Sequence, residues 1–157
     1  MCEIVEASTA EQVEQVRTLF VEYRAELAVE HCFQSFDEEI ASLPGVYAPP
    51  TGKLLLANVV GQPVGCIGLR PFPTEGCCEM KRLYVRPPFR GDKIGKKLAE
   101  RVIEEARRLG YSSMRLDSHP PSMEAAIKMY RKLGFREVSP DPVDPVPGLI
   151  YMELSLA

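Results

Sequence analysis

Residues 78–97 constrain the fold of this chain most strongly, because a strand-like run leads through two prolines and a glycine turn directly into a helix. Large and β-branched side chains alternate through residues 80–86, which predicts a strand. We expect Met80, Arg82 and Tyr84 to share one face of that strand. The consecutive prolines then end it, since proline cannot donate to a sheet ladder.

The helix after the prolines is expected to begin between Arg90 and Gly95 and to end at Gly110. Its first turn has unpaired backbone N–H groups and a partial positive charge, and glycine lets a ligand approach the backbone closely. We therefore expect an anionic phosphate to bind here. The alternative is a helix start that is charged only for solubility. Four cations accompany this turn: Arg90, Lys93, Lys96 and Lys97.

Charge is distributed unevenly along the chain. Residues 1–45 contain ten acidic and two basic residues, a net charge of −8, whereas residues 81–97 contain seven basic residues and one acidic residue, a net charge of +6. We expect two separate poles, of which the basic one suits a polyanionic ligand. The acidic pole is either a solvated helix face or a surface that favours cationic amines.

Two other kinds of phosphate-binding protein do not match the sequence. A Walker-type loop is excluded because Gly91 and Gly95 have three residues between them and Lys97 replaces the required Ser or Thr. A nucleic-acid partner is not expected, because the chain has a net charge of −3 and no basic stripe interleaved with aromatic residues.

Length and composition indicate one domain over residues 1–157, with 45% hydrophobic and 26% charged residues. The apolar stretch at residues 54–60 is too short to span a bilayer, so no membrane partner is expected. The five cysteines have no metal-ligand spacing, which predicts reduced thiols, no bound metal and a cytoplasmic location.

The remaining elements are read from apolar periodicity and turn residues, and they predict a mixed α/β chain. Gly61 and Gln62 are expected to form the turn of a hairpin. A proline-rich segment, residues 140–147, either forms the rim of a substrate pocket or is an ordinary stiff connection. The predicted strands are residues 3–6, 54–60, 64–69, 114–117, 135–138 and 149–154, and the predicted helices are residues 13–27, 36–43 and 122–133.

From residue 53 to residue 135 the chain resembles the GCN5-related N-acetyltransferase (GNAT) superfamily. The family signature is Arg or Gln, two residues, Gly, one residue, then Gly or Ala; Arg90 and Gly95 are in register with it. Lys93 stands where the first signature glycine is expected, and a non-glycine residue resists left-handed backbone angles. The segment AAIKMYRKLGF also resembles a family helix, with Tyr130 as its tyrosine.

The resemblance implies a mixed, mostly antiparallel sheet of six to seven strands, splayed at its centre and flanked by about four helices. It implies direct transfer of an acetyl group from acetyl-CoA to a small-molecule or peptide amine, and it allows a homodimer. A different reading is a non-catalytic acyl-CoA-binding sensor or interaction module. A covalent route through Cys66, Cys77 or Cys78 is disfavoured because no His or Asp partner is indicated.

The resemblance also assigns the cofactor residues. The backbone of Leu83, Tyr84 and Val85 would hold the pantetheine arm, and the hydroxyl of Tyr130 would reach the sulfur and protonate the leaving thiolate. The diphosphate would lie on the residues of the loop and first helical turn: Arg90, Gly91, Asp92, Lys93, Ile94, Gly95 and Lys96.

The amine must lose a proton, and Glu79 is the first candidate base because the family places a glutamate at the matching point of the strand. Asp117 and His119 are rivals. The competing structural readings are a surface Glu79 paired with Lys81 or Arg82, and a Tyr130 that is simply packed in the core. Residues expected on the acceptor side are Tyr23, Phe33 and Phe36, with His31 and Cys32 near them, and Asp117 and His119.

Overall fold

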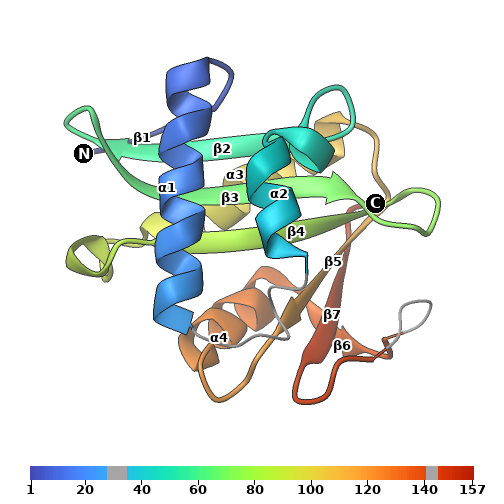
Figure 1. The fold of residues 1–157 in the computed structure, drawn as a ribbon. Coiled ribbons are helices and arrows are strands. Elements are labelled where there is room, and N and C mark those ends of the chain that lie inside the picture. Colours follow the sequence, from blue (N-terminus) through green and yellow to red (C-terminus); the bar gives the residue numbers. More distant parts are fainter. Residues whose placement is uncertain (28–34, 141–144) are drawn as a thin grey trace.

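The structure is a computed structural model that describes residues 1–27, 35–140 and 145–157. One seven-stranded sheet organises these residues, in the order β1-β2-β3-β4-β5-β7-β6 (Figure 1). Within the described chain β4 and β5 are the one parallel pair, and the other neighbouring pairs are antiparallel. The predicted mixed, mostly antiparallel sheet is confirmed. The strands are β1 (Cys2–Glu6), β2 (Lys53–Val59), β3 (Gln62–Pro71), β4 (Cys77–Val85), β5 (Ser113–Ser118), β6 (Arg136–Val138) and β7 (Ile150–Ser155).

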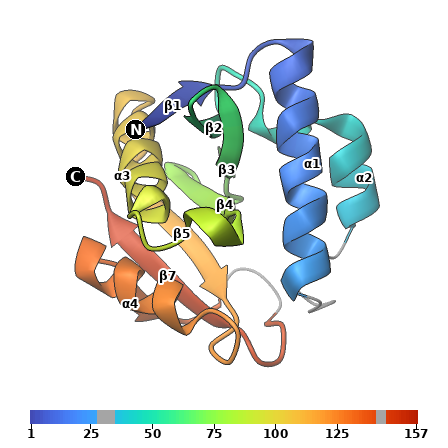
Figure 2. The ribbon, with the colours of Figure 1, turned by 90° about the vertical axis from the view of Figure 1, so that its left-hand side faces the viewer.

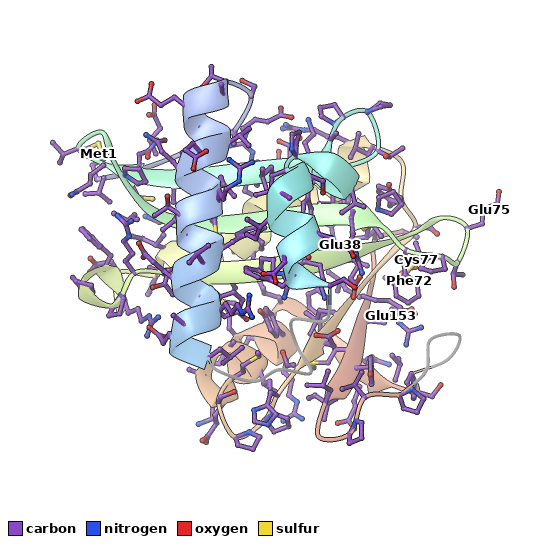
Figure 3. All side chains as sticks on the ribbon, in the orientation of Figure 1. Met1, Glu38, Phe72, Glu75, Cys77 and Glu153 are labelled. Atoms are coloured by element: carbon purple, nitrogen blue, oxygen red, sulfur yellow. The ribbon has the colours of Figure 1, made fainter. Side chains whose placement is uncertain are left out.

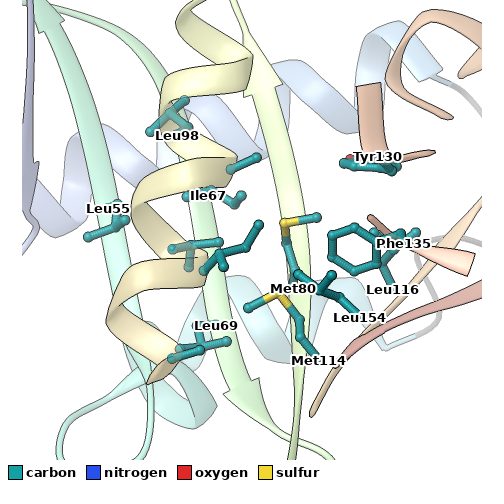
Figure 4. Close-up of a cluster of buried hydrophobic side chains, with 14 of the residues drawn as sticks. Leu55, Ile67, Leu69, Met80, Leu98, Met114, Leu116, Tyr130, Phe135 and Leu154 are labelled. Carbon is teal, nitrogen blue, oxygen red and sulfur yellow. The ribbon is translucent and has the colours of Figure 1, made fainter. Parts of the chain in front are cut away.

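Helices cover both faces of the sheet. The helices α1 (Ala10–Leu27) and α2 (Phe36–Ser42) lie on one face, while α3 (Ile94–Arg108) and α4 (Glu124–Leu133) lie on the other (Figure 2). Each face has its own buried cluster, and Figure 4 shows part of the larger one, beneath α3 and α4. No described helix combines the length and the apolar character needed to cross a membrane.

The β2–β3 hairpin turns one residue earlier than the sequence analysis expected. Val60 and Gly61 have φ values of 50° and 74°, and Gln62 already pairs with Val59. A two-residue turn with positive φ at both positions matches the twist of its flanking strands. The predicted Gly61–Gln62 turn was therefore wrong, because a β-branched valine occupies a left-handed position that glycine normally takes.

A bulge in β4 changes which side chains share a face. Lys81 pairs with Gly68 and Tyr84 with Cys66, so β4 advances three residues while β3 advances two. Arg82 lies within this step and has a φ of 61°. An extra residue of this kind interrupts the ladder and reverses the alternation beyond it. The expectation that Met80 and Tyr84 share a face was therefore wrong: Met80 belongs to the cluster under α3, and Tyr84 to the cluster under α1.

The parallel pairing of β4 with β5 is short. It runs from the Cys77–Ser113 pair to the Glu79–Arg115 pair, and beyond it the two strands diverge (Figure 1). Arg115 holds the paired end: its guanidinium lies 5.2 Å from the Phe72 ring centroid and 3.8 Å from Glu153, both labelled in Figure 3. The sheet is thus splayed between its two central strands, as the resemblance implied.

The start of α3 has the left-handed residue that the family signature requires, but that residue is a lysine. Lys93 is the N-cap with φ 62° and ψ 21°, and no side chain caps the helix. The turn has therefore kept its geometry without the glycine. An L side chain in this region costs about 1–2 kcal/mol.

Replacing Lys93 with glycine should stabilise the protein. The gain from removing the left-handed penalty is partly offset by the larger unfolded-state entropy of glycine, which leaves a net increase of about 0.5–1 kcal/mol in the free energy of unfolding. Urea denaturation measures this value. Lys93→Ala is the matched control, because it removes the same charge and keeps Cβ; equal stability of the two variants would contradict the strain argument.

Candidate active site

The splay between β4 and β5 forms a narrow cleft that connects the two faces of the sheet. Its enclosed volume is about 30 Å³, enough for about two water molecules. This size suits the meeting of small reactive groups and not the enclosure of a whole ligand. The lining residues on the α3–α4 side are Met80, Leu83, Leu116, Ser118, Met123 and Tyr130, and those on the α1–α2 side are Tyr23, Lys81, Arg82 and Asp117.

The α3–α4 side of the cleft is apolar except for two hydroxyl groups. Tyr130 on α4 is 6% exposed and its ring packs edge-on against Phe135, with 5.7 Å between the centroids. Burial raises the pKa of Tyr130, so the phenol stays protonated well above neutral pH. The Oγ of Ser118 is buried and has no hydrogen-bond partner in the described chain. Because buried polar groups are rarely unpaired, this hydroxyl indicates room for a ligand group.

The α1–α2 side is charged. The Nζ of Lys81 lies 3.8 Å from an Oδ of Asp117, and both side chains are mostly buried. Tyr23 of α1 stacks on Tyr84, with 5.6 Å between ring centroids. Tyr23 and Asp117, two of the residues predicted for the acceptor side, therefore line the cleft together.

A buried ion pair fixes the bulge beside the cleft. Arg82 donates two hydrogen bonds to Glu39 of α2, at 3.0 and 2.9 Å, and the Tyr47 hydroxyl donates a third at 2.9 Å. Burial alone would raise the pKa of Glu39, but the hydrogen bonds and charge of Arg82 outweigh it and lower the pKa. Phe36, predicted to line the acceptor side, is buried, with the guanidinium carbons of Arg24 and Arg82 at 5.1 and 5.3 Å from its ring centroid, and is not among the residues that line the cleft.

Glu79 lies at the end of the β4–β5 ladder, where the splay begins. Its partner is Arg70 of β3, at 2.9 Å, and not Lys81 or Arg82, which the competing structural reading had named. The reason is that Arg70 lies directly opposite Glu79 in the β3–β4 register. Glu79 is 7% exposed and is not among the residues that line the cleft. Its role as base stays a prediction.

The other predicted acceptor-side residues are distributed as follows. A nitrogen of the His119 ring lies 2.7 Å from the Ser122 hydroxyl, and His119 is not among the cleft-lining residues. Phe33, with His31 and Cys32, falls outside the described residues. Of the proline-rich segment, residues 141–144 are also outside them, and its role as a pocket rim stays a prediction.

The predicted phosphate loop has an open backbone. A Cβ added at Gly91 would meet no atom within 4 Å, and one added at Gly95 would approach only Val85, at 3.8 Å. With no side-chain cap on α3, its first N–H groups are available to an anion. The loop is therefore open to an anion, and its role in binding the diphosphate stays a prediction.

The two charge poles are not separate, contrary to the sequence-based expectation. Glu22 and Glu26 of α1 form ion pairs with Arg86, at 2.7 Å, and Arg90, at 2.6 Å, because α1 crosses the sheet beside β4. The hydrogen bond from Arg86 lowers the pKa of Glu22. Within the described residues no ion pair involves the remaining loop cations Lys93, Lys96 and Lys97, so the loop keeps a net positive charge.

Lys81 and Ser118 are two of the cleft residues that the sequence analysis missed. Both belong to the strands that diverge and lie past the last pair of the β4–β5 ladder, and the sequence analysis predicted no pairing of these strands that could have marked them. The bulge hid that Arg82 shares a side with Lys81, since strict alternation of the strand would place the two on opposite faces.

Comparison with known proteins agrees with this geometry. Residues 13–135 match the family model of the acetyltransferase (GNAT) family. An uncharacterized N-acetyltransferase of Schizosaccharomyces pombe is 38% identical over 148 residues, which cover 94% of this chain and 90% of that protein. An IAA acetyltransferase of Azospirillum brasilense is 36% identical over 110 residues, covering 69% and 71%.

Solved structures share the fold. A GNAT-family acetyltransferase of Staphylococcus aureus has a TM-score of 0.81 at 21% identity, covering 100% of both chains. The PaiA N-acetyltransferase of Thermoplasma acidophilum, solved in complex with coenzyme A, has a TM-score of 0.73 at 20% identity, covering 99% of each chain. The chain therefore belongs to the GNAT family and is an acetyl-CoA-dependent N-acetyltransferase.

Proposed function

We propose that this enzyme acetylates a small-molecule amine by direct attack within a ternary complex. The observation that carries the proposal is the two-sided cleft, which is apolar toward α3 and α4 and charged toward α1 and α2. The N-acetylaspartate synthetase of Mus musculus, 33% identical over 120 residues, is named for a small acetylated molecule. The aligned region covers 76% of this chain and 39% of the synthetase.

Acetyl-CoA supplies the acetyl group as a thioester. The amine nitrogen forms a bond to the carbonyl carbon while the carbon–sulfur bond breaks. An ammonium acceptor gives up two protons, of which one ends on the coenzyme thiol and the other passes to solvent. The enzyme must therefore accept a proton on the acceptor side of the cleft and deliver one on the donor side.

The donor side uses β4 and the start of α3. The backbone of Leu83–Val85 follows the bulge and runs along the splay, where it would hold the pantetheine arm as an added strand. The diphosphate would lie on the N–H groups of residues 94–96 with Arg90, Lys93 and Lys96 beside them. Tyr130 is held protonated by burial, which supports its role as the proton donor to the thiolate.

Asp117 is the carboxylate that we assign as base. An alkyl amine with a pKa near 10.4 costs about 4.6 kcal/mol to deprotonate at pH 7, so a positioned base is needed. Asp117 lines the cleft on the acceptor side. Glu79 is not among the cleft-lining residues and forms an ion pair with Arg70.

Direct attack is supported by the state of the cysteines. Burial raises the pKa of Cys66 and Cys77, and that of Cys78 to about 12, so none of these thiols is a ready nucleophile. Cys2, Cys66, Cys77 and Cys78 are free thiols. We infer that the chain works as one domain in the reducing cytoplasm, and the homodimer stays a prediction.

Two substitutions test the cofactor loop in opposite directions. Arg90→Glu should raise the acetyl-CoA dissociation constant at least about tenfold, because a charge-assisted contact is lost and repulsion is added. Glu26→Gln should lower the acetyl-CoA dissociation constant by about 1.4- to 5-fold. In the wild-type protein Arg90 must give up its exposed ion pair with Glu26 to bind the phosphate, and the variant has no such ion pair to lose. Calorimetric titration measures both values.

The control for these titrations is Lys132→Glu, an exposed position in the last turn of α4. It should change the dissociation constant by less than twofold. Weaker binding in Glu26→Gln, or unchanged binding in Arg90→Glu, would contradict the assignment of Arg90 to the phosphates.

The choice of base is tested by a pair of isosteric variants. Asp117→Asn should lower kcat/KM for the acceptor at least about 100-fold, the usual range for loss of a general base. Glu79→Gln should lower it less than about tenfold, through its effect on Arg70 and packing. Steady-state thiol release gives both values, and the acetyl-CoA dissociation constants verify that each variant binds the donor. A larger loss in Glu79→Gln would transfer the role to Glu79.

A further inference from the structure

We propose that the acceptor is a free amino acid or a similar small zwitterion, with its carboxylate bound by Lys81 and its ammonium by Asp117. The proposal rests on the proposed function and names the class of acceptor. It is carried by the charges on the α1–α2 side of the cleft.

Lys81 and Asp117 are partly buried and are poorly satisfied by each other. Their side chains are 13% and 24% exposed, and the 3.8 Å between Nζ and Oδ is too long for a hydrogen bond. In the described part of the chain neither head group has a hydrogen-bond partner. Charged groups that have lost much of their contact with water are stabilised by hydrogen bonds, so this pair has donor and acceptor capacity left for a ligand.

The neighbouring charges are already matched. Glu39 accepts two hydrogen bonds from Arg82 and one from Tyr47, and Glu79 is paired with Arg70. Glu39 is also close enough for the charge of Lys81 to help lower its pKa, but its oxygens are occupied by Arg82 and Tyr47. One ammonium and one carboxylate of the cleft lining therefore remain for the acceptor.

A zwitterion matches this arrangement better than a simple amine does. A cation bound to Asp117 would face the ammonium of Lys81 across about the same short distance, and the two positive charges would repel. An α-amino acid has its ammonium and carboxylate on one carbon, so a single small molecule satisfies both side chains. A peptide N-terminus has an amide where the amino acid has its carboxylate and loses the contact to Lys81.

The ammonium contact also suits the chemistry. With its carboxylate on Lys81, the acceptor would have its nitrogen beside Asp117, the proposed base, and near the opening to the donor side. Tyr130, whose pKa is raised by burial and further by the charge of Asp117, lines the same cleft.

The test compares matched acceptors. For each of the twenty amino acids, kcat/KM is measured by thiol release with the free acid, its carboxamide and the amine that lacks the carboxylate. We expect the best free amino acid to exceed its carboxamide and its plain amine by about 10- to 100-fold, the effect of one charge-assisted contact. Lys81→Met should reduce this ratio to about one, and Lys81→Arg should keep most of it.

Lys132→Met, which removes a lysine from the exposed end of α4, is the matched control and should keep the full ratio. Equal or higher kcat/KM for amines and carboxamides, or a ratio that Lys81→Met does not change, would overturn the zwitterion proposal and leave N-acetyl transfer intact. Saturable acetyl-CoA binding without thiol release for any of these acceptors or for a peptide library would overturn the proposed small-molecule function itself, and the acceptor class with it.

Discussion

The extra residue of β4 at Arg82 is the constraint on which the rest of the site depends. It ends the regular alternation of the strand just past the last pair of the β4–β5 ladder, so that Lys81 and Arg82 face α1 and α2 while Leu83 returns to the α3–α4 face. A non-glycine residue with positive φ persists only when its surroundings determine it. Here the two hydrogen bonds to Glu39 and the ring of Phe36 hold the Arg82 side chain, and with it the bulge.

The same arrangement explains why acidic helices lie against a basic strand. Glu39, Glu22 and Glu26 each form an ion pair with an arginine of β4 or the following loop. The buried Arg82–Glu39 pair fixes geometry, and the exposed Arg90–Glu26 pair is weak enough to be exchanged for a phosphate. The same kind of glutamate–arginine contact therefore serves two purposes: Arg82–Glu39 holds the fold, and Arg90–Glu26 lies where the cofactor is expected to bind.

Much of the fold follows from local sequence patterns. The strand–proline–glycine–helix order at residues 78–97 predicted the β4–α3 unit, and the helical spacing before Gly134 predicted α4, while the family resemblance implied that Tyr130 lies at the site. Lys93 shows that the turn geometry is dictated by its surroundings more than by its residue type, since a lysine adopts the left-handed angles of the missing glycine. These features are local, and periodicity and turn chemistry describe them adequately.

Apart from Asp117, the charged residues of the site could not be predicted in this way. A bulge depends on how two strands pair, which the sequence of one strand does not show. The ion-pair partners of Arg82 and Glu79 are also not adjacent to them in sequence. Charge counts along the chain suggested separated poles, whereas the tertiary structure brings α1 and α2 onto β4 and joins them. Ser118 lies just past the predicted strand 114–117 and had no assigned role, and its burial without a partner marks it as part of the cleft.

Hydrogen exchange with and without acetyl-CoA, read by mass spectrometry, tests most directly whether the splay and the first turn of α3 hold the donor. The account predicts that saturating acetyl-CoA slows exchange in residues 82–85 and 94–97 and leaves the edge strands β1 and β6 unchanged. Saturable binding without protection of either segment would contradict it.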